Sequence, residues 1–163
     1  MCGIFSFISG YTIDQTKLEQ ISKEGMKCKA RGPDNTVTRI INNSMFMMFH
    51  RLKINDITDA GNQPIVHPDD FNLILICNGE IYNFNEISSK YDFQLKSKSD
   101  CEIIVHLYKK FGIEKTLVQL DGVFAFVLID LTRSVIYAAR DPIGVRSMYI
   151  GINEIDIGFS SEL

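Results

Sequence analysis

The chain has 163 residues, of which 45% are hydrophobic and 23% are charged, and its formal net charge at pH 7 is −3. This length can bury the core of one domain, and we expect a single domain over residues 1–163. The slightly acidic charge gives no support for a nucleic-acid or membrane-surface partner, and no apolar run approaches the roughly 20 residues that span a bilayer.

The first segments predict a strand followed by a helix. Residues 3–8 form an apolar run that is typical of a short strand. From about residue 14 to residue 30, apolar and small residues fall on one helical stripe. Gly32-Pro33 predicts the end of that helix, because proline cannot continue it.

The next segments predict three strands. The runs 36–41 and 45–50 have β-like patterns, and Asn42-Asn43-Ser44 between them is typical of a hairpin turn. A polar loop follows. The fully apolar run 73–77 then predicts a strand that is buried on both faces.

The second half of the chain predicts three helices and then four strands. Ser99 or Asp100 is expected to cap the second of these helices. Two groups of strands with helices between them favour an α+β fold in which two sheets stack with helices outside. The helices are expected at residues 83–90, 100–111 and 113–120, and the strands at 123–130, 135–139, 148–152 and 155–160.

Cys2 directly follows the initiator Met1. Removal of Met1 would leave Cys2 with both a thiol and a free α-amino group. Such an amine can act as the general base for its own side chain, which would make Cys2 a self-contained nucleophile. The alternative is a small residue that opens a buried strand.

Three further patterns place polar residues at expected strand ends and helix starts, where functional residues are often held. They are His50-Arg51-Leu52, the run from Asn78 to Asn83, and Ser99-Asp100. Each has a structural alternative. Arg51 can be a solvated cation, Asn78-Gly79 a hairpin turn and Asp100 a helix cap.

Taken together, these residues describe a site for a small amino acid amide. The guanidinium of Arg51 can hold an α-carboxylate with two parallel hydrogen bonds, and Asp100 can hold an α-ammonium group. The side-chain amide of Asn78 and the backbone N–H of Gly79 can donate to a developing oxyanion. Glutamine has both the zwitterionic end and the carboxamide that these groups suit.

Other kinds of site have weak support in the sequence. The four cysteines contain no Cys-x-x-Cys pair and the three histidines no His-x-x-x-His pair, so we expect no metal site. The start of the chain has no secretory signal. We therefore expect reduced thiols in an intracellular, cytoplasmic protein.

An ordered set of motifs along nearly the whole chain resembles the N-terminal glutaminase domain of asparagine synthetases. That domain is a class II glutamine amidotransferase and a member of the N-terminal-nucleophile hydrolases. The motifs are Met1-Cys2-Gly3-Ile4, Arg31-Gly32-Pro33-Asp34, His50-Arg51-Leu52, Gln63-Pro64, Asn78-Gly79-Glu80-Ile81-Tyr82-Asn83, Asp100 with Glu102-Ile103-Ile104, the run from Leu120 to Phe126, Arg140-Asp141, Gly144-Val145-Arg146 and Ser161-Glu162.

The resemblance implies a four-layer αββα sandwich, with two antiparallel sheets between helical layers. It also implies that Cys2 is the nucleophile after removal of Met1, and that Asn78 and Gly79 form the oxyanion hole. The substrate-binding residues that it implies are Arg51 for the glutamine carboxylate, Asp100 for the amino group, and Leu52, Lys53, Ile54, Asn55 and Glu80 beside them.

The implied reaction is the hydrolysis of glutamine through a γ-glutamyl thioester on Cys2. Family members carry a second domain that uses ATP and magnesium, whereas this sequence stops at residues 160–163, where the link to that domain begins. No Gly-rich phosphate loop is present. We therefore expect no cofactor in this chain, and we expect an ammonia-using synthetase as a separate partner chain.

Two other functions stay open on the sequence. One is a low-activity remnant of asparagine synthetase that binds glutamine or a partner as a regulatory module. The other is a different amide-cleaving N-terminal-nucleophile hydrolase. The joint presence of Cys2, Arg51, Asn78, Gly79 and Asp100 favours the glutaminase, because Arg51 and Asp100 suit a zwitterionic amino acid.

Overall fold

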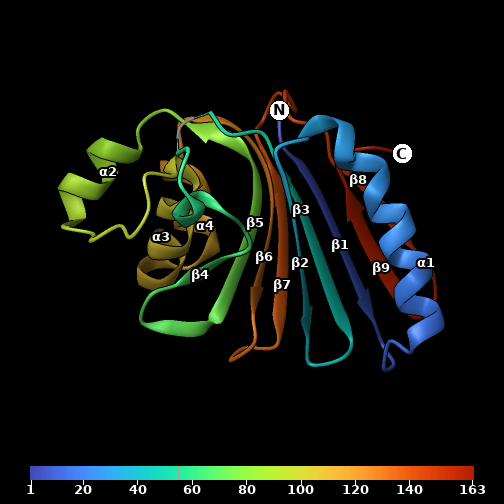
Figure 1. The fold of residues 1–163 in the computed structure, drawn as a ribbon. Helices are drawn as coiled ribbons and strands as arrows, with labels where there is room; N and C mark the ends of the chain where they lie inside the picture. Colours follow the sequence, from blue (N-terminus) through green and yellow to red (C-terminus); the bar gives the residue numbers. More distant parts are fainter. Residues whose placement is uncertain (55) are drawn as a thin grey trace.

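Two antiparallel β-sheets pack face to face, and helices cover their two outer sides (Figure 1). The computed structural model describes residues 1–54 and 56–163. Sheet A contains five strands, in the order β2 (Asn35–Ile41), β3 (Met45–Arg51), β1 (Gly3–Ser9), β9 (Asp156–Ser160) and β8 (Tyr149–Ile152). Sheet B contains four strands, in the order β4 (Ile65–His67), β5 (Asp70–Ile81), β6 (Gly122–Asp130) and β7 (Val135–Arg140).

The helices form the two outer layers and one short connection. Helix α1 (Gln15–Gly25) and the 3₁₀ helix η1 (Met26–Arg31) belong to sheet A's outer layer, and the 3₁₀ helix η2 (Asp59–Gly61) lies in the connection from β3 to β4. No helix in the described residues is both long enough and apolar enough to cross a membrane. Sheet B's outer layer contains α2 (Phe84–Tyr91), η3 (Asp100–Glu102), α3 (Ile103–Phe111) and α4 (Ile113–Gln119).

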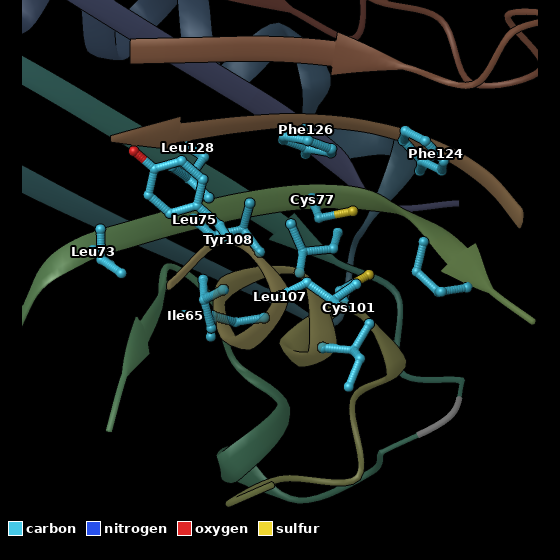
Figure 2. Packing of buried hydrophobic residues seen from close by; sticks show 14 of the residues in the cluster. Ile65, Leu73, Leu75, Cys77, Cys101, Leu107, Tyr108, Phe124, Phe126 and Leu128 are labelled. Atoms are coloured by element: carbon cyan, nitrogen blue, oxygen red, sulfur yellow. The ribbon is translucent and has the colours of Figure 1, made fainter. Parts of the chain in front are cut away.

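The hydrophobic interior has three parts because each sheet is covered on both faces. Between the sheets, residues such as Phe49 of sheet A and Ile76 of sheet B are fully or almost fully buried. Alternate residues of β5, including Leu75, point to the opposite side and pack against α3 (Figure 2). A smaller cluster, which includes Ile21, fills the space between α1 and sheet A. The continuous apolar runs in β5 and β6 follow from this double coverage.

The structure confirms the predicted α+β architecture of two stacked antiparallel sheets with helices outside. The expected hairpin turn between β2 and β3 is also present. Asn42 and Asn43 have φ angles of 48° and 54° there, in the left-handed region that asparagine tolerates in tight hairpin turns. Several local details differ from expectation. The first predicted helix ends as the 3₁₀ helix η1, and the helix predicted at 100–111 begins as the 3₁₀ helix η3. The strand predicted at 73–77 is the longer β5, and the three-residue strand β4 was expected to be loop.

Asn78 and Gly79 lie inside β5, so the plain-turn alternative for this dipeptide is wrong. The strand continues because both residues pair with β6, Asn78 opposite Ala125 and Gly79 opposite Phe124. A Cβ atom at position 79 would lie 2.7 Å from the Cβ of Phe124. Glycine at position 79 therefore allows β5 and β6 to lie close together, and it does not mark a reversal of the chain.

The predicted capping of the helix at residues 100–111 is also wrong. Ser99 precedes η3 but makes no side-chain capping hydrogen bond. The carboxylate of Asp100 instead accepts a hydrogen bond of 2.6 Å from the backbone N–H of Ile81, near the end of β5. Asp100 thus connects the start of η3 to sheet B, which places its carboxylate beside the end of that strand.

Candidate active site

One pocket lies where β1 begins and where β3 and β5 end. The antiparallel pairing of β1 and β3 puts Gly3 opposite His50, so Cys2 and Arg51 meet at the same edge of sheet A. The end of β5 and the start of η3 supply the facing wall. Eight of the residues predicted for the site line this pocket, namely Cys2, Arg51, Leu52, Ile54, Asn78, Gly79, Glu80 and Asp100.

The Cys2 sulfur is held against the segment that follows β3. The backbone N–H of Leu52 donates to Cys2 Sγ over 3.4 Å, and the thiol lies 3.7 Å from the carbonyl oxygen of Leu52. Met1 also lines the pocket and is half exposed. Cys2 is therefore held by main-chain contacts of its sulfur with Leu52, and the residue forms part of the pocket wall.

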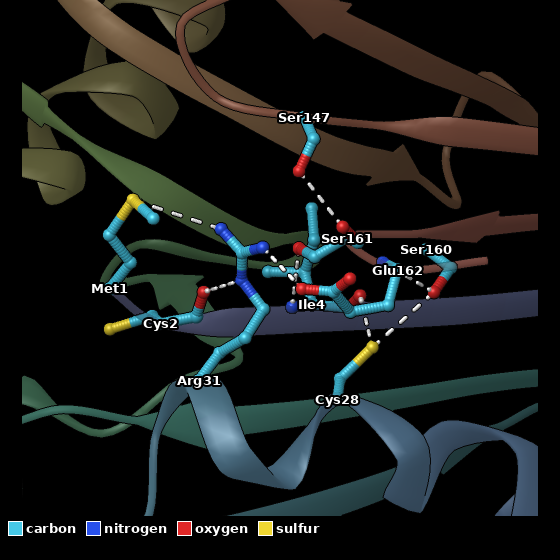
Figure 3. A network of polar contacts seen from close by, with 9 residues as sticks. All are labelled: Met1, Cys2, Ile4, Cys28, Arg31, Ser147, Ser160, Ser161 and Glu162. Carbon is cyan, nitrogen blue, oxygen red and sulfur yellow. Dashed lines mark hydrogen bonds and ion pairs between the residues drawn. The ribbon is translucent and has the colours of Figure 1, made fainter.

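Arg31 ties the backbone of Cys2 to the far end of the chain (Figure 3). Its Nε–H donates to the carbonyl oxygen of Cys2 over 3.1 Å, and its Nη1 forms an ion pair with Glu162 at 2.5 Å. Next to this contact, Ile4 and Ser161 exchange two hydrogen bonds. These contacts make the start of β1 a rigid support for the sulfur nucleophile.

Burial raises the pKa of the Cys2 thiol above its ordinary value. The N–H of Leu52, the terminal amine of Met1 and the charge of Arg51 act in the opposite direction, but burial has the largest effect. A thiol with a raised pKa is mostly protonated at neutral pH, whereas the thiolate is the reactive nucleophile. A reaction of this thiol as a nucleophile would be helped by a base next to the sulfur.

The guanidinium of Arg51 is buried and held by the loop that follows it. Nη1 donates to the carbonyl oxygen of Thr58 over 2.6 Å and to Oδ1 of Asn62 over 2.8 Å, and Nη2 donates to the carbonyl oxygen of Asp56. A Cβ atom at Gly61 would lie 3.0 Å from Cζ of Arg51 and even closer to Nη2. The loop thus packs directly on the guanidinium, and the solvated-cation alternative for Arg51 is wrong.

Asn78 is 2% exposed, and its side-chain nitrogen Nδ2 has no hydrogen-bond partner within residues 1–54 and 56–163. A buried amide donor without a partner is costly, and native proteins seldom tolerate one without a functional reason. Because Asn78 and Cys2 line the same pocket, this amide is a candidate donor to a ligand bound there.

The remaining predicted site residues differ in their placement. Ile54 is largely exposed at the pocket, and Glu80 is exposed where β5 ends. Lys53 donates its backbone N–H to Asp34 and is not among the described residues that line the pocket. Asn55, which was predicted to contact substrate, lies outside the described residues.

Three polar residues of the pocket had no role assigned from the sequence. Gln63 exchanges two hydrogen bonds with the backbone of Cys77, of 3.0 and 2.6 Å, and so fixes the strand just before Asn78. Asp56 is buried beside Arg51. Arg146 lines the pocket and has a buried Nε without a partner in the described part of the chain. Gln63 and Arg146 belong to recognised motifs, but only the fold shows what they contact.

The described residues contain no group of three or more His, Cys, Asp or Glu side chains placed to hold a metal ion. The pocket instead combines a thiol, a buried amide donor, a guanidinium and a carboxylate. Such a set can bind the charged end of an amino acid and bring a carbonyl group to the thiol.

Comparison with known proteins connects this geometry to one family. A family model described as "Glutamine amidotransferase domain" matches residues 1–163. A probable glutamine-hydrolysing asparagine synthetase of Acanthamoeba polyphaga mimivirus is 40% identical over 170 residues, which cover all of this chain and 30% of the viral protein. The glutamine-hydrolysing asparagine synthetase of Homo sapiens is 38% identical over 156 residues, which cover 94% of this chain and 27% of the human protein.

The chain thus spans under a third of the length of these curated relatives. Among solved structures, glutamine phosphoribosylpyrophosphate amidotransferase from B. subtilis has a TM-score of 0.74 to this fold. The match covers 98% of this chain and 42% of the other, at 18% sequence identity. That likeness shows a shared fold.

Proposed function

Because the chain belongs to the glutamine amidotransferase domain family, we propose that it hydrolyses the side-chain amide of L-glutamine to glutamate and ammonia. The observation that carries this proposal is the unpartnered, buried Nδ2 of Asn78 in the pocket of the Cys2 sulfur. A nucleophile and a preorganised donor in one pocket are the two parts that acyl transfer needs.

In the proposed first step, removal of Met1 gives Cys2 its own α-amino group. This amine accepts the thiol proton, and Cys2 Sγ attacks the carbonyl carbon of the glutamine side chain. The oxyanion that forms is stabilised by Nδ2 of Asn78 and the backbone N–H of Gly79. The amine then returns the proton to the leaving nitrogen, so ammonia departs and a γ-glutamyl thioester remains on Cys2.

In the proposed second step, water attacks the thioester carbonyl while the same amine takes a proton from it. The bond to sulfur breaks, Cys2 recovers its thiol, and glutamate leaves. In the chain that retains Met1, burial raises the pKa of the Cys2 thiol. A neighbouring base would help such a buried thiol to ionise. No cofactor in this chain is required.

The proposed substrate contacts use the charges at the two sides of the pocket. Arg51 holds the α-carboxylate and Asp100 the α-ammonium, with Leu52, Ile54 and Glu80 as further contacts. Lys53 and Asn55, which are next to Leu52 and Ile54 in the sequence, are also proposed to contact glutamine. Since all of these groups hold the end of glutamine that does not react, they act through binding and orientation.

The proposal extends to the fate of the ammonia. The human relative is a glutamine-hydrolysing asparagine synthetase, and the viral relative is a probable one. We propose that a separate synthetase chain uses the ammonia for asparagine formation or a similar amidation. We also propose a cytoplasmic location, where the reducing environment keeps the Cys2 thiol free.

The test is release of glutamate and ammonia from glutamine by the purified chain, with mass spectrometry of its N-terminus. We expect turnover from the protein that begins at Cys2. We expect none from Cys2→Ala or from a form that retains Met1. Turnover by either of these forms would refute the mechanism.

A glutamine analogue with an electrophilic chloromethyl ketone in place of the amide provides a second measurement. It should label Cys2 in the protein that lacks Met1. Labelling without turnover would support a glutamine-binding module that does not hydrolyse its ligand. If the analogue does not label Cys2 and glutamine is not turned over, the support for glutamine as a ligand is lost.

A further inference from the structure

The two charged groups assigned to the glutamine backbone lie on different segments of the chain. Arg51 ends β3 in sheet A, whereas Asp100 begins η3 on the outer side of sheet B. Binding of both ends of one amino acid requires a fixed distance between these groups. Something must therefore hold the segment after β3 against the segment before η3.

Asp56 makes this connection through its carboxylate. Its Oδ2 accepts a hydrogen bond of 3.0 Å from the backbone N–H of Lys98, two residues before Asp100. Its Oδ1 accepts bonds from the backbone N–H and the hydroxyl of Thr58, at 2.8 and 2.6 Å. The side chain is 5% exposed, so these contacts replace water.

The backbone of the same residue reaches Arg51. The carbonyl oxygens of Asp56 and Thr58 both accept hydrogen bonds from the guanidinium. The turn that the Asp56 carboxylate stabilises is thus the turn that holds the guanidinium. A shift of Asp56 would move Arg51 and would also release Lys98.

The segment before η3 is anchored from its other side by Glu102. This buried carboxylate accepts hydrogen bonds from the backbone N–H groups of Lys96 and Ser97, at 2.7 and 2.8 Å. The main chain of 96–98 is therefore held between the carboxylates of Asp56 and Glu102. Because Lys98 is two residues from Asp100, this arrangement also limits where Asp100 can lie.

Asp56 is suited to stay charged in this position. The hydrogen bond from the Thr58 hydroxyl has the largest effect and lowers the pKa of the Asp56 carboxyl, with further lowering by the N–H of Lys98 and the charge of Arg51. Burial acts in the opposite direction but is outweighed. A charged acceptor makes a stronger hydrogen bond than a neutral one.

We propose that Asp56 is a positioning residue that holds Arg51 and Asp100 at the spacing of an amino acid's carboxylate and ammonium groups. The inference rests on the proposed glutamine hydrolysis and deepens it. In this proposal Asp56 acts through Arg51 and Asp100 rather than on the reacting atoms. Its replacement should therefore weaken glutamine binding and leave the nucleophile intact.

The test compares Asp56→Asn with the wild-type protein, both beginning at Cys2. Asparagine keeps the shape, but its amide cannot accept at both oxygen positions, so either the Lys98 or the Thr58 contact is lost. Loss of a hydrogen bond to a buried charged group corresponds to roughly a 10- to 100-fold change in a binding constant. We expect the KM for glutamine to rise by that factor and kcat to fall by less than about fivefold.

A direct binding readout is protection of Cys2 from iodoacetamide, followed by peptide mass spectrometry. The alkylation rate without glutamine should stay within about twofold in Asp56→Asn, while the glutamine concentration for half-protection rises roughly tenfold or more. Asp69→Asn is the matched control, because it makes the same substitution at an exposed aspartate that does not line the pocket. Its half-protection concentration should stay within about threefold of wild type.

The outcomes separate the two proposals. Wild-type protein that is not protected by glutamine would count against the proposed function itself. Wild-type protection together with unchanged half-protection in Asp56→Asn would overturn the positioning role. An Asp56→Asn protein that melts at the wild-type temperature, but alkylates several times faster or slower without glutamine, would overturn it as well.

Discussion

At the scale of single residues, the pocket contains buried polar groups that do not favour the stability of the fold. Nδ2 of Asn78 is buried without a partner in the described chain, and the thiol of Cys2 has a pKa raised by burial. A core built for stability alone would have an apolar residue at position 78, because an unpaired buried amide costs about 1–3 kcal/mol. The unused donor is explained if an oxyanion occupies the pocket during the reaction.

Replacement of Asn78 by alanine should therefore remove transition-state stabilisation with little loss of stability. We expect kcat for glutamine hydrolysis to fall by about 10²–10³, the usual effect of losing one oxyanion donor. The control is Asn72→Ala, which changes an exposed asparagine at the other end of the same strand. A kcat within about threefold of wild type for Asn78→Ala would contradict the assigned role.

At the scale of elements, the segment before η3 depends on one buried carboxylate. Burial acts to raise the pKa of Glu102, but hydrogen bonds from His106, from the Ser97 hydroxyl and from the N–H groups of Lys96 and Ser97 outweigh it and lower the pKa to about 2. Glu102 is 3% exposed, so these bonds are little screened by water. The loop that leads to Asp100 is thus held mainly through charge-assisted hydrogen bonds.

The acid stability of the protein should report on Glu102. Because its folded-state pKa is depressed from 4.5 to about 2, its contribution is complete above about pH 4.5 and is lost as the pH falls toward 2. A pKa change of one corresponds to about 1.4 kcal/mol, so the contribution near neutral pH is on the order of 3 kcal/mol. Urea unfolding should show Glu102→Gln less stable than wild type near neutral pH.

The pH series supplies the decisive comparison. The difference in unfolding free energy between wild type and Glu102→Gln should shrink between pH 4.5 and about 2. The exposed Glu114 of α4 gives the control, since Glu114→Gln should change stability by less than about 0.5 kcal/mol. A difference that stayed constant over the whole acid range would show that the Glu102 charge does not stabilise the loop.

At the scale of the whole molecule, the pocket exists because two sheets pack face to face. Cys2 and Arg51 come from sheet A, whereas Asn78 comes from sheet B. The apolar layer between the sheets, which includes Ile76, sets how these two walls face each other. Packing of this layer therefore determines both stability and the geometry of the site.

A cavity in this layer should lower the free energy of unfolding. Ile76 is fully buried between the sheets, and Ile76→Ala should lower the free energy of unfolding by about 2–5 kcal/mol. Ile152 is 73% exposed on β8, and Ile152→Ala should change it by less than about 0.5 kcal/mol. Equal losses for the two variants in urea unfolding would show that the inter-sheet layer is not the principal core.

The sequence by itself determined the elements and the chemistry of the candidate residues. Apolar periodicity located most strands and helices, because burial on one or both faces leaves a regular pattern. The ordered motifs around Cys2, Arg51 and Asn78 were enough to indicate the family and the reaction. They were local signals that need no knowledge of which residues meet in space.

Only the tertiary structure decided how those residues are held. Asn78-Gly79 is a turn by its local preference, but pairing with β6 makes it part of a strand. Asp100 is a helix cap by its local preference, but its carboxylate receives the N–H of Ile81. The contact from Asp56 to Lys98 joins residues 42 positions apart. Such contacts depend on the packing of the two sheets, so they cannot be predicted from the sequence near each residue.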